Sequence, residues 1–159
     1  MGPDSTASGE PAEGTHDLRE IPPEECTDLL HAGQIGRLAV QTADGPDCVP
    51  VNYLVAADPS GAGGGVRSEV IVFRTDEGTK LAGSALATVA FEVDDMDPGS
   101  QRGWSVMVRG VANDITDALD PLAVQLRTLP LHPWASGPKP RWVMIRPRSI
   151  TGRRVHARS

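Results

Sequence analysis

The stretch that decides the fold is IGRLAVQTADGPDCVPVNYLV, residues 35–55. Residues 35–42 place Leu38 and Val40 on one face and polar or small side chains on the other, which is the period of a half-buried strand. Residues 48–55 repeat this alternation with valines. The Asp44-Gly45 pair between the two runs is typical of a tight hairpin turn. The stretch therefore predicts an antiparallel β-hairpin.

Outside this hairpin, four more stretches have strand character and three have helical character. The predicted strands cover residues 69–75, 86–94, 104–115 and 141–150, and the predicted helices cover 22–33, 79–85 and 117–129. Short connections favour antiparallel pairing, and six twisted strands with one apolar face tend to close into a barrel, which removes exposed edges. The predicted fold class is mainly β: a six-stranded antiparallel barrel with short helices.

The chain divides into a tail and one domain. Residues 1–17 are small, polar and acidic and have no apolar period, so we expect them to be disordered. Residues 18–159 have the size of a single domain, which can form a stable core without metal or disulfide staples.

The formal net charge is −6 and is unevenly distributed. Residues 139–159 contain seven of the 15 basic residues and no acid. This segment is interpreted either as a basic last strand that balances acidic neighbours or as a binding surface for an anion or a nucleic acid. The overall negative charge argues against a nucleic-acid partner.

The sequence also indicates a cytoplasmic protein without a membrane partner. No apolar run approaches the ~20 residues that span a bilayer. The N-terminus lacks a basic segment followed by an apolar one, so no signal peptide is predicted. Cys26 and Cys48 lie in apolar surroundings and are expected to be buried thiols of a reducing compartment.

The most informative polar stretch is FRTDEGTKL, residues 73–81. A strand ends in a cation and a hydroxyl, a glycine follows, and a second hydroxyl and cation open a helix. A phosphate group needs such a set of partners. The alternative interpretation is a solvated turn with Thr79 as the helix cap. The stretch is not a P-loop, because the G-x-x-x-x-G-K-[ST] pattern is absent.

No metal site and no catalytic residue are predicted. Asp94, Asp95 and Asp97 are interpreted as a solvated acidic loop rather than as ligands of a hard cation. The four histidines are scattered without the spacing of metal ligands, and no Ser/His/Asp set is suggested.

At the level of the whole chain, several short motifs occur in a specific order and spacing. They are IGRLA (35–39), VPVNY (49–53), VFRT (72–75), GTKL (78–81), VAFEVD (89–94), GWSV (103–106), VRG (108–110) and ITGR (150–153). Together they resemble the pyridoxamine 5'-phosphate oxidase-like FMN-binding split barrels, and most of all the short branch that includes nitroimidazole-resistance proteins. The resemblance runs from about residue 24 to residue 155.

The resemblance implies FMN as the cofactor and assigns its contacts. Four residues of one strand edge would present backbone groups to the isoalloxazine ring: Val49, Pro50, Val51 and Asn52. Arg74 and Thr75 lie where the family contacts the ring and the ribityl phosphate, and Thr79 and Lys80 occupy the phosphate position.

The resemblance also implies a homodimer. Trp104 and Ser105 begin the strand that, in this family, approaches the flavin across the dimer interface. A barrel with three tryptophans and exposed apolar strand faces is expected to bury one face against its twin.

Two departures from the family pattern limit the expected function. Residues 150–156 lack the arginine-rich signature that grips the substrate phosphate in true pyridoxamine phosphate oxidases. Arg74 stands where the nitroimidazole-resistance proteins have a histidine. We therefore expect an FMN-dependent oxidoreductase that transfers a hydride through flavin N5 to or from an unidentified small molecule. The alternatives are a barrel that binds the deazaflavin F420 or haem, and a flavin-binding module that is not an enzyme.

Overall fold

The computed structural model describes residues 16–61, 68–78 and 86–157. Its nine elements are β1 (His16–Ile21), α1 (Pro23–Ala32), β2 (Ile35–Thr42), β3 (Gly45–Ala57), β4 (Glu69–Thr75), β5 (Ala87–Asp97), β6 (Arg102–Asp114), α2 (Pro121–Leu126) and β7 (Arg141–Ala157). The helix predicted over residues 79–85 lies outside the described residues. The part of the chain described contains no helix long and apolar enough to cross a membrane.

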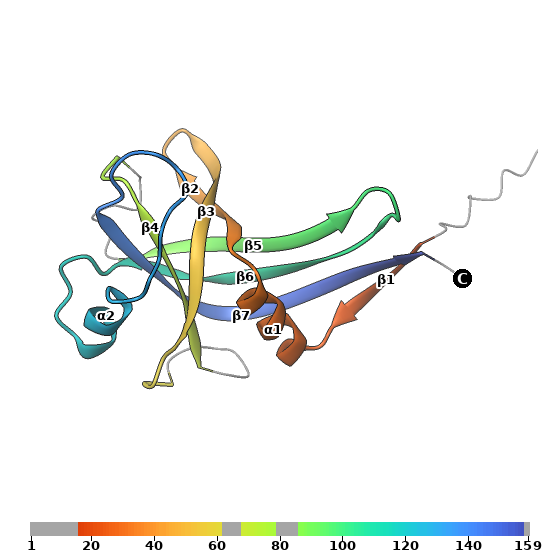
Figure 1. The fold of residues 1–159 in the computed structure, drawn as a ribbon, viewed down its shortest axis with the longest axis horizontal. Helices are drawn as coiled ribbons and strands as arrows, with labels where there is room; N and C mark the ends of the chain where they lie inside the picture. Colours follow the sequence, from red (N-terminus) through yellow and green to blue (C-terminus); the bar gives the residue numbers. More distant parts are fainter. Residues whose placement is uncertain (1–15, 62–67, 79–85, 158–159) are drawn as a thin grey trace, which may run out of the picture.

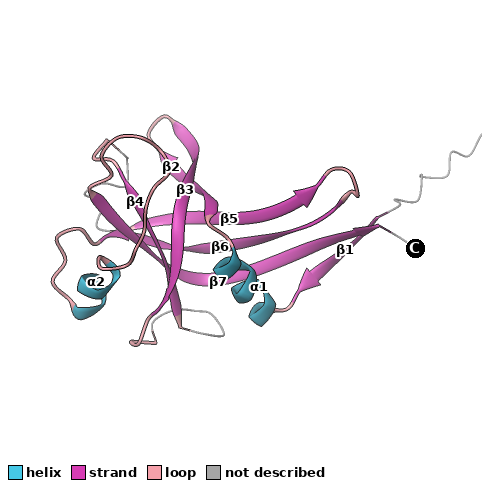
Figure 2. Ribbon diagram, viewed as in Figure 1, coloured by secondary structure: helices cyan, strands magenta, loops and turns pink. Residues whose placement is uncertain are grey.

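The strands form one antiparallel sheet that closes on itself. Its order is β1-β7-β4-β3-β2-β5-β6, and the last strand in this order, β6, also pairs with β7. The closed ring therefore contains β2 to β7, which confirms the predicted barrel. The predicted strand count is one too low, because β1 is added outside the ring along the second half of β7. Figure 2 shows α2 at one end of the barrel and α1 at the opposite side.

The 35–55 stretch folds as the predicted hairpin. Residues of β2 pair with those of β3 from Ile35 opposite Asn52 to Thr42 opposite Gly45. The two turn residues are thus 43 and 44, one position earlier than predicted. Gly45 follows the turn with φ of 118°, a left-handed conformation that other residues adopt only with strain.

Strands β5, β6 and β7 continue beyond the barrel as an arm, formed by residues 94–97, 102–105 and 152–157 together with β1 (Figure 1). The predicted last strand ended at residue 150, and no strand was predicted before the first helix. His16 and Asp17, which belong to the predicted tail, are the first residues of β1. Residues 1–15 of that tail lie outside the described part.

Helix α2 is shorter than the predicted helix over 117–129. Pro121 has no N–H and favours the first turn of a helix, and Asp120 caps this turn through a 3.0 Å bond from the Ala123 N–H to its Oδ1. Leu119, which lies within the predicted range, is 88% exposed. The proline and the cap together start the helix after Leu119.

Two apolar clusters hold the structure together. The larger one fills the barrel and includes Leu38, Tyr53, Phe73, Phe91 and Val108. The smaller one packs α2 and the following loop against the outer sides of β4 and β7, and its members include Val72, Leu122, Leu126, Leu131 and Met144. Cys26 on α1 is buried within the larger cluster, but Cys48 on β3 is exposed, so the prediction of two buried thiols is wrong for Cys48.

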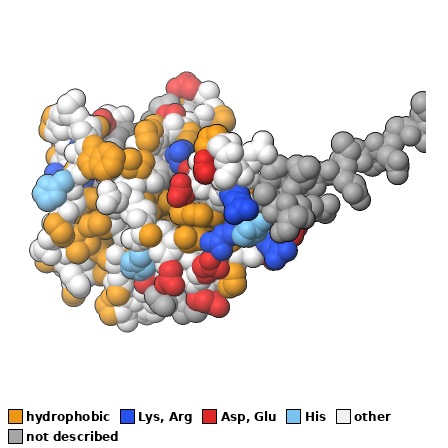
Figure 3. All heavy atoms as spheres, turned by 45° about the vertical axis from the view of Figure 1, so that its right-hand side comes forward, with side chains coloured by type: hydrophobic (Ala, Val, Ile, Leu, Met, Phe, Trp, Pro, Cys, Tyr) orange, Lys and Arg blue, Asp and Glu red, His pale blue; other side chains and the backbone are white. Residues whose placement is uncertain are grey.

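The basic C-terminal segment is partly balanced by acidic neighbours, as one of the two interpretations expected. Four of its seven cations form ion pairs within the described structure: Lys139 with Asp76 (3.8 Å), Arg141 with Asp114 (2.6 Å), Arg146 with Asp58 (3.2 Å) and Arg154 with Glu25 (2.7 Å). Figure 3 shows acidic and basic side chains next to each other on the face that it presents.

Gly36 makes the packing of Phe91 inside the barrel possible. A Cβ at this position would overlap the ring of Phe91, which is fully buried and packs edge-on against Tyr53 with ring centroids 4.9 Å apart. We expect Gly36→Ala to lower the free energy of unfolding by about 2–3 kcal/mol, because an overfilled core must shift side chains or backbone. Urea denaturation measures this change.

Gly78→Ala is the matched control for Gly36→Ala. A Cβ at Gly78 would have ordinary contact distance to its nearest neighbour, 3.7 Å from Asp76 Oδ1. The control should change the unfolding free energy by less than about 0.5 kcal/mol. Equal stability of the two variants would contradict the packing argument.

Candidate functional site

The site begins where β3 and β4 separate. These strands pair from Ala57 opposite Glu69 to Tyr53 opposite Phe73. Beyond this point β3 pairs only with β2 among the strands described, while residues 74 and 75 of β4 pair with β7. The facing edges of β3 and β4 therefore diverge here, and their backbone groups do not form hydrogen bonds between these two strands. A pocket of about 290 Å³ lies in the gap.

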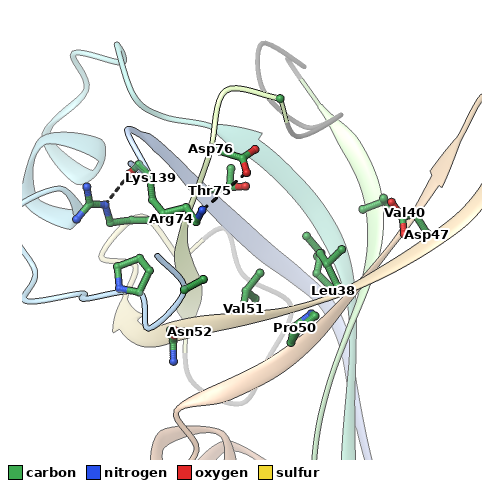
Figure 4. A pocket seen from close by; sticks show the side chains of 14 residues that line it. Leu38, Val40, Asp47, Pro50, Val51, Asn52, Arg74, Thr75, Asp76 and Lys139 are labelled. Carbon is green, nitrogen blue, oxygen red and sulfur yellow. Dashed lines mark hydrogen bonds and ion pairs between the residues drawn. The ribbon is translucent and has the colours of Figure 1, made fainter. Parts of the chain in front are cut away.

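Three parts of the chain line this pocket. Strands β2 and β3 supply an apolar wall with one carboxylate at its rim: Leu38, Val40, Asp47, Val49, Pro50, Val51 and Asn52. The end of β4 and the residues after it supply polar groups: Arg74, Thr75, Asp76 and Gly78. The loop before β7 closes the third side with Pro133, Ala135 and Lys139. Figure 4 shows these walls around the gap.

Among the described residues, Lys139 places a positive charge at the pocket. Its ammonium lies 3.8 Å from Asp76 Oδ2 and donates to the Ser136 carbonyl over 3.4 Å. Because the Asp76 side chain is 55% exposed, this ion pair is weak and leaves the ammonium able to bind another anion. Lys139 itself is only 19% exposed.

Arg74 lines the pocket, but its guanidinium points toward the loop before β7 (Figure 4). Its Nε donates to the Lys139 carbonyl over 3.0 Å, and its Nη1 donates to the Leu131 carbonyl over 3.4 Å. The guanidinium carbon lies 5.1 Å from the centre of the Trp142 ring, within the range of a cation–π contact. Two nitrogens of this side chain, Nε and Nη1, therefore donate to the loop.

The structure brings together six of the ten residues that the resemblance assigned to the cofactor. Around the pocket lie Val49, Pro50, Val51, Asn52, Arg74 and Thr75. Thr79 and Lys80 lie outside the described residues. Trp104 and Ser105 are on the arm, where Trp104 lines a separate hollow with Arg102, Arg154 and His156. Within one chain these two residues do not reach the pocket.

Several pocket residues were not predicted, and Lys139 is the most important of them. It follows the pocket's β4 wall by more than sixty positions, and nothing in the local sequence connects the two. Its only signal was its place at the head of the basic C-terminal segment. Asp47, Asp76, Pro133 and Ala135 likewise reach the pocket through the tertiary fold.

The pKa shifts with the clearest causes belong to structural groups. Burial raises the pKa of Tyr53, whose hydroxyl donates to the Leu30 carbonyl over 2.7 Å and ties α1 to β3. Burial and the neighbouring Asp94 raise the pKa of Glu92 on β5, and Arg37 partly offsets this rise. None of these groups lines the pocket. Among the residues described, no group of three or more His, Cys, Asp or Glu side chains could hold a metal ion.

Comparison with known proteins supports a common origin over nearly the whole chain. The family model described as pyridoxamine 5'-phosphate oxidase matches residues 22–154. An uncharacterized protein of Mycobacterium tuberculosis is 30% identical over 147 residues, which cover 92% of this chain and 91% of that protein.

Two solved structures are similar in both sequence and fold. A FAD-binding protein of Mycobacterium smegmatis is 30% identical with a TM-score of 0.56, over 87% of this chain and 98% of that one. A conserved protein of unknown function from Corynebacterium diphtheriae is 32% identical with a TM-score of 0.64, over 86% of this chain and 96% of that one.

Proposed function

Because the chain belongs to the pyridoxamine 5'-phosphate oxidase family, we propose that it is a flavin-dependent oxidoreductase whose cofactor is FMN. The observation that carries this proposal is the pocket between the diverging edges of β3 and β4, with an apolar wall on one side and Lys139 on the other. The relative from Mycobacterium smegmatis that binds FAD supports a flavin as the ligand class.

The residues present fit the chemical parts of a flavin nucleotide. Leu38, Val49 and Val51 offer an apolar surface for a planar ring and would exclude water from it. The β3 edge that β4 leaves at Tyr53 has backbone groups for the polar edge of such a ring. Lys139 and the Thr75 hydroxyl offer a cation and a donor for a phosphate.

When bound, FMN would supply the redox chemistry, since N5 of its ring accepts or donates a hydride. The protein residues would orient the ring and leave one of its faces accessible to a small, planar substrate. We do not propose pyridoxamine phosphate oxidation, because residues 150–156 lack the arginine-rich pattern that this substrate requires.

Binding experiments test the cofactor directly. We expect the purified protein to be yellow, with flavin absorption near ~450 nm, and the ligand released by denaturation to have the mass of FMN. Release of FAD would support a flavin as the ligand but would overturn the assignment of FMN. Preferential binding of F420 or haem in parallel titrations would replace the flavin in this proposal. A bound flavin that can be reduced but is not turned over with any oxidant or substrate class would favour a binding module.

We further propose that the protein works as a cytoplasmic homodimer. The arm carries Trp104 together with Leu18 and Met96, which are 58% and 48% exposed. In a dimer, the second subunit would cover these apolar side chains. Both cysteines are free thiols, which suits a reducing compartment. Light scattering should give twice the 16.8 kDa mass of the chain, and a stable monomer would overturn the dimer.

A further inference from the structure

The loop between α2 and β7 forms one wall of the pocket although it has no regular structure. Its residues 130–140 contain four prolines and no helix or strand. Such a segment has few internal hydrogen bonds, so contacts with the barrel must fix its position. The pocket therefore depends on the residues that anchor this loop, which we call the 130–140 loop.

Among the described residues, two barrel side chains form hydrogen bonds with the backbone of this loop. Arg74 donates to two carbonyls near the ends of the loop, those of Leu131 and Lys139. Asn52 acts in the middle, where its Oδ1 accepts the Trp134 N–H over 2.7 Å. The amide of Asn52 also donates to the Gln34 carbonyl over 3.4 Å, which orients its side chain.

The anchors determine which loop residues reach the pocket. Pro133 and Ala135 flank the fixed Trp134 amide and line the pocket, while the Trp134 side chain is 68% exposed. At the other end, the bond from Arg74 holds the backbone of Lys139 so that its ammonium faces the β4 edge (Figure 4). A guanidinium suits this task, because its planar fork can serve two acceptors at once.

We infer that Arg74 and Asn52 are positioning residues for the 130–140 loop, and that Lys139 presents the positive charge to the anionic end of the ligand. The part concerning the ligand rests on the proposed flavin. It revises the role that the resemblance assigned to Arg74, and it adds a side-chain role for Asn52 to the backbone role assigned there. It also makes the loop wall, with four prolines, part of the binding site.

Hydrogen exchange of the protein without added flavin tests the anchors. Arg74→Lys keeps the charge but removes the fork, and Asn52→Leu removes the acceptor of the Trp134 amide. We expect each variant to speed amide exchange in residues 131–139 by about tenfold or more, the factor that corresponds to one lost hydrogen bond. The matched control is Arg148→Lys on an exposed arginine of β7, which should leave this exchange unchanged.

Titration with FMN and with riboflavin, which lacks the phosphate, tests the charge. We expect Lys139→Met to weaken FMN binding by about 10- to 100-fold and to leave riboflavin binding unchanged, while Lys139→Arg retains most of the FMN affinity. Arg74→Lys should weaken both ligands by a similar factor, because a pocket wall loosens.

The outcomes separate the two halves of the inference. Arg74→Lys could leave amide exchange in residues 131–139 as in the wild type and weaken FMN binding but not riboflavin binding. This result would make Arg74 a phosphate ligand and overturn its positioning role. Equal loss of FMN and riboflavin in Lys139→Met would overturn the assigned charge. If the wild-type protein binds neither flavin, the proposed function and the role of Lys139 both fail, and the exchange data alone decide on the anchors.

Discussion

Replacing Asp58 by alanine is expected to lower the free energy of unfolding by about 3 kcal/mol. The carboxylate is buried at the end of β3, where it accepts bonds from the Ser60 N–H (2.9 Å), the Ser60 hydroxyl (2.6 Å) and Arg146 Nε (3.2 Å). The backbone of Asp58 also closes the base of the loop through a 2.8 Å bond to the Ser68 carbonyl. Removing the carboxylate leaves these donors unsatisfied, and urea denaturation measures the loss.

Asp97→Ala is the matched control for Asp58→Ala. Asp97 also accepts a backbone N–H and a hydroxyl in a turn, from Gly99 (2.9 Å) and Ser100 (2.6 Å). Its side chain is exposed and has no arginine partner in the described part of the chain. This substitution should change stability by less than about 1 kcal/mol. If the two variants lose equal stability, the effect comes from the turns and not from the buried ion pair.

The Asp58 carboxylate also predicts a pH dependence. Burial alone would raise its pKa, but the bonds from Ser60 and the charge of Arg146 outweigh burial and lower it. A carboxyl whose pKa is lowered by folding stabilises the protein above its unfolded pKa, and this stabilisation is lost as the pH falls through the folded pKa. In Asp58→Asn, the decline of the unfolding free energy below pH 4 should therefore be shallower than in the wild type.

The barrel could be predicted because its strands carry local patterns. The alternation in residues 35–55 and the apolar residues of β4, β5 and β6 each indicate a strand without knowledge of its neighbours. β1 has no such pattern. Its residues 17–20 are mostly charged, and among residues 17–21 only Ile21 is buried. The strand forms because the second half of β7 offers an edge with which it can pair. The strand therefore depends on a partner more than 130 positions away.

Binding residues were predictable to the extent that the sequence places them on strands. The β3 edge and the end of β4 line the pocket. Both could be predicted, because the hairpin and β4 have clear strand patterns in the sequence. The direction of Arg74 was not predictable, because it depends on the carbonyls of a loop without regular structure. Asp58 is a similar case: nothing in the residues around it indicates an ion pair, and only the fold brings Arg146 to it.

Filling the pocket should have the largest effect on ligand binding. Val49 lines the pocket from β3 and is 36% exposed, so the strand has room for a larger side chain at this position. In Val49→Trp, the indole would occupy the apolar wall where we place the flavin ring. We expect the dissociation constant for FMN to rise by about 100-fold or more, equivalent to ~3 kcal/mol or more. Fluorescence quenching of free FMN measures this change.

The same substitution at Val124 separates a blocked pocket from a general effect of a new tryptophan. Val124 lies on α2, is 46% exposed and does not line this pocket, so Val124→Trp should bind FMN like the wild type. Riboflavin distinguishes the ring from the phosphate. Because we place the ring against Val49, Val49→Trp should weaken riboflavin binding by the same factor as FMN binding, whereas Lys139→Met should weaken only FMN binding. A folded Val49→Trp variant with wild-type affinity for both ligands would show that the ring does not bind in the gap between β3 and β4, since a flavin and an indole could not occupy the same wall.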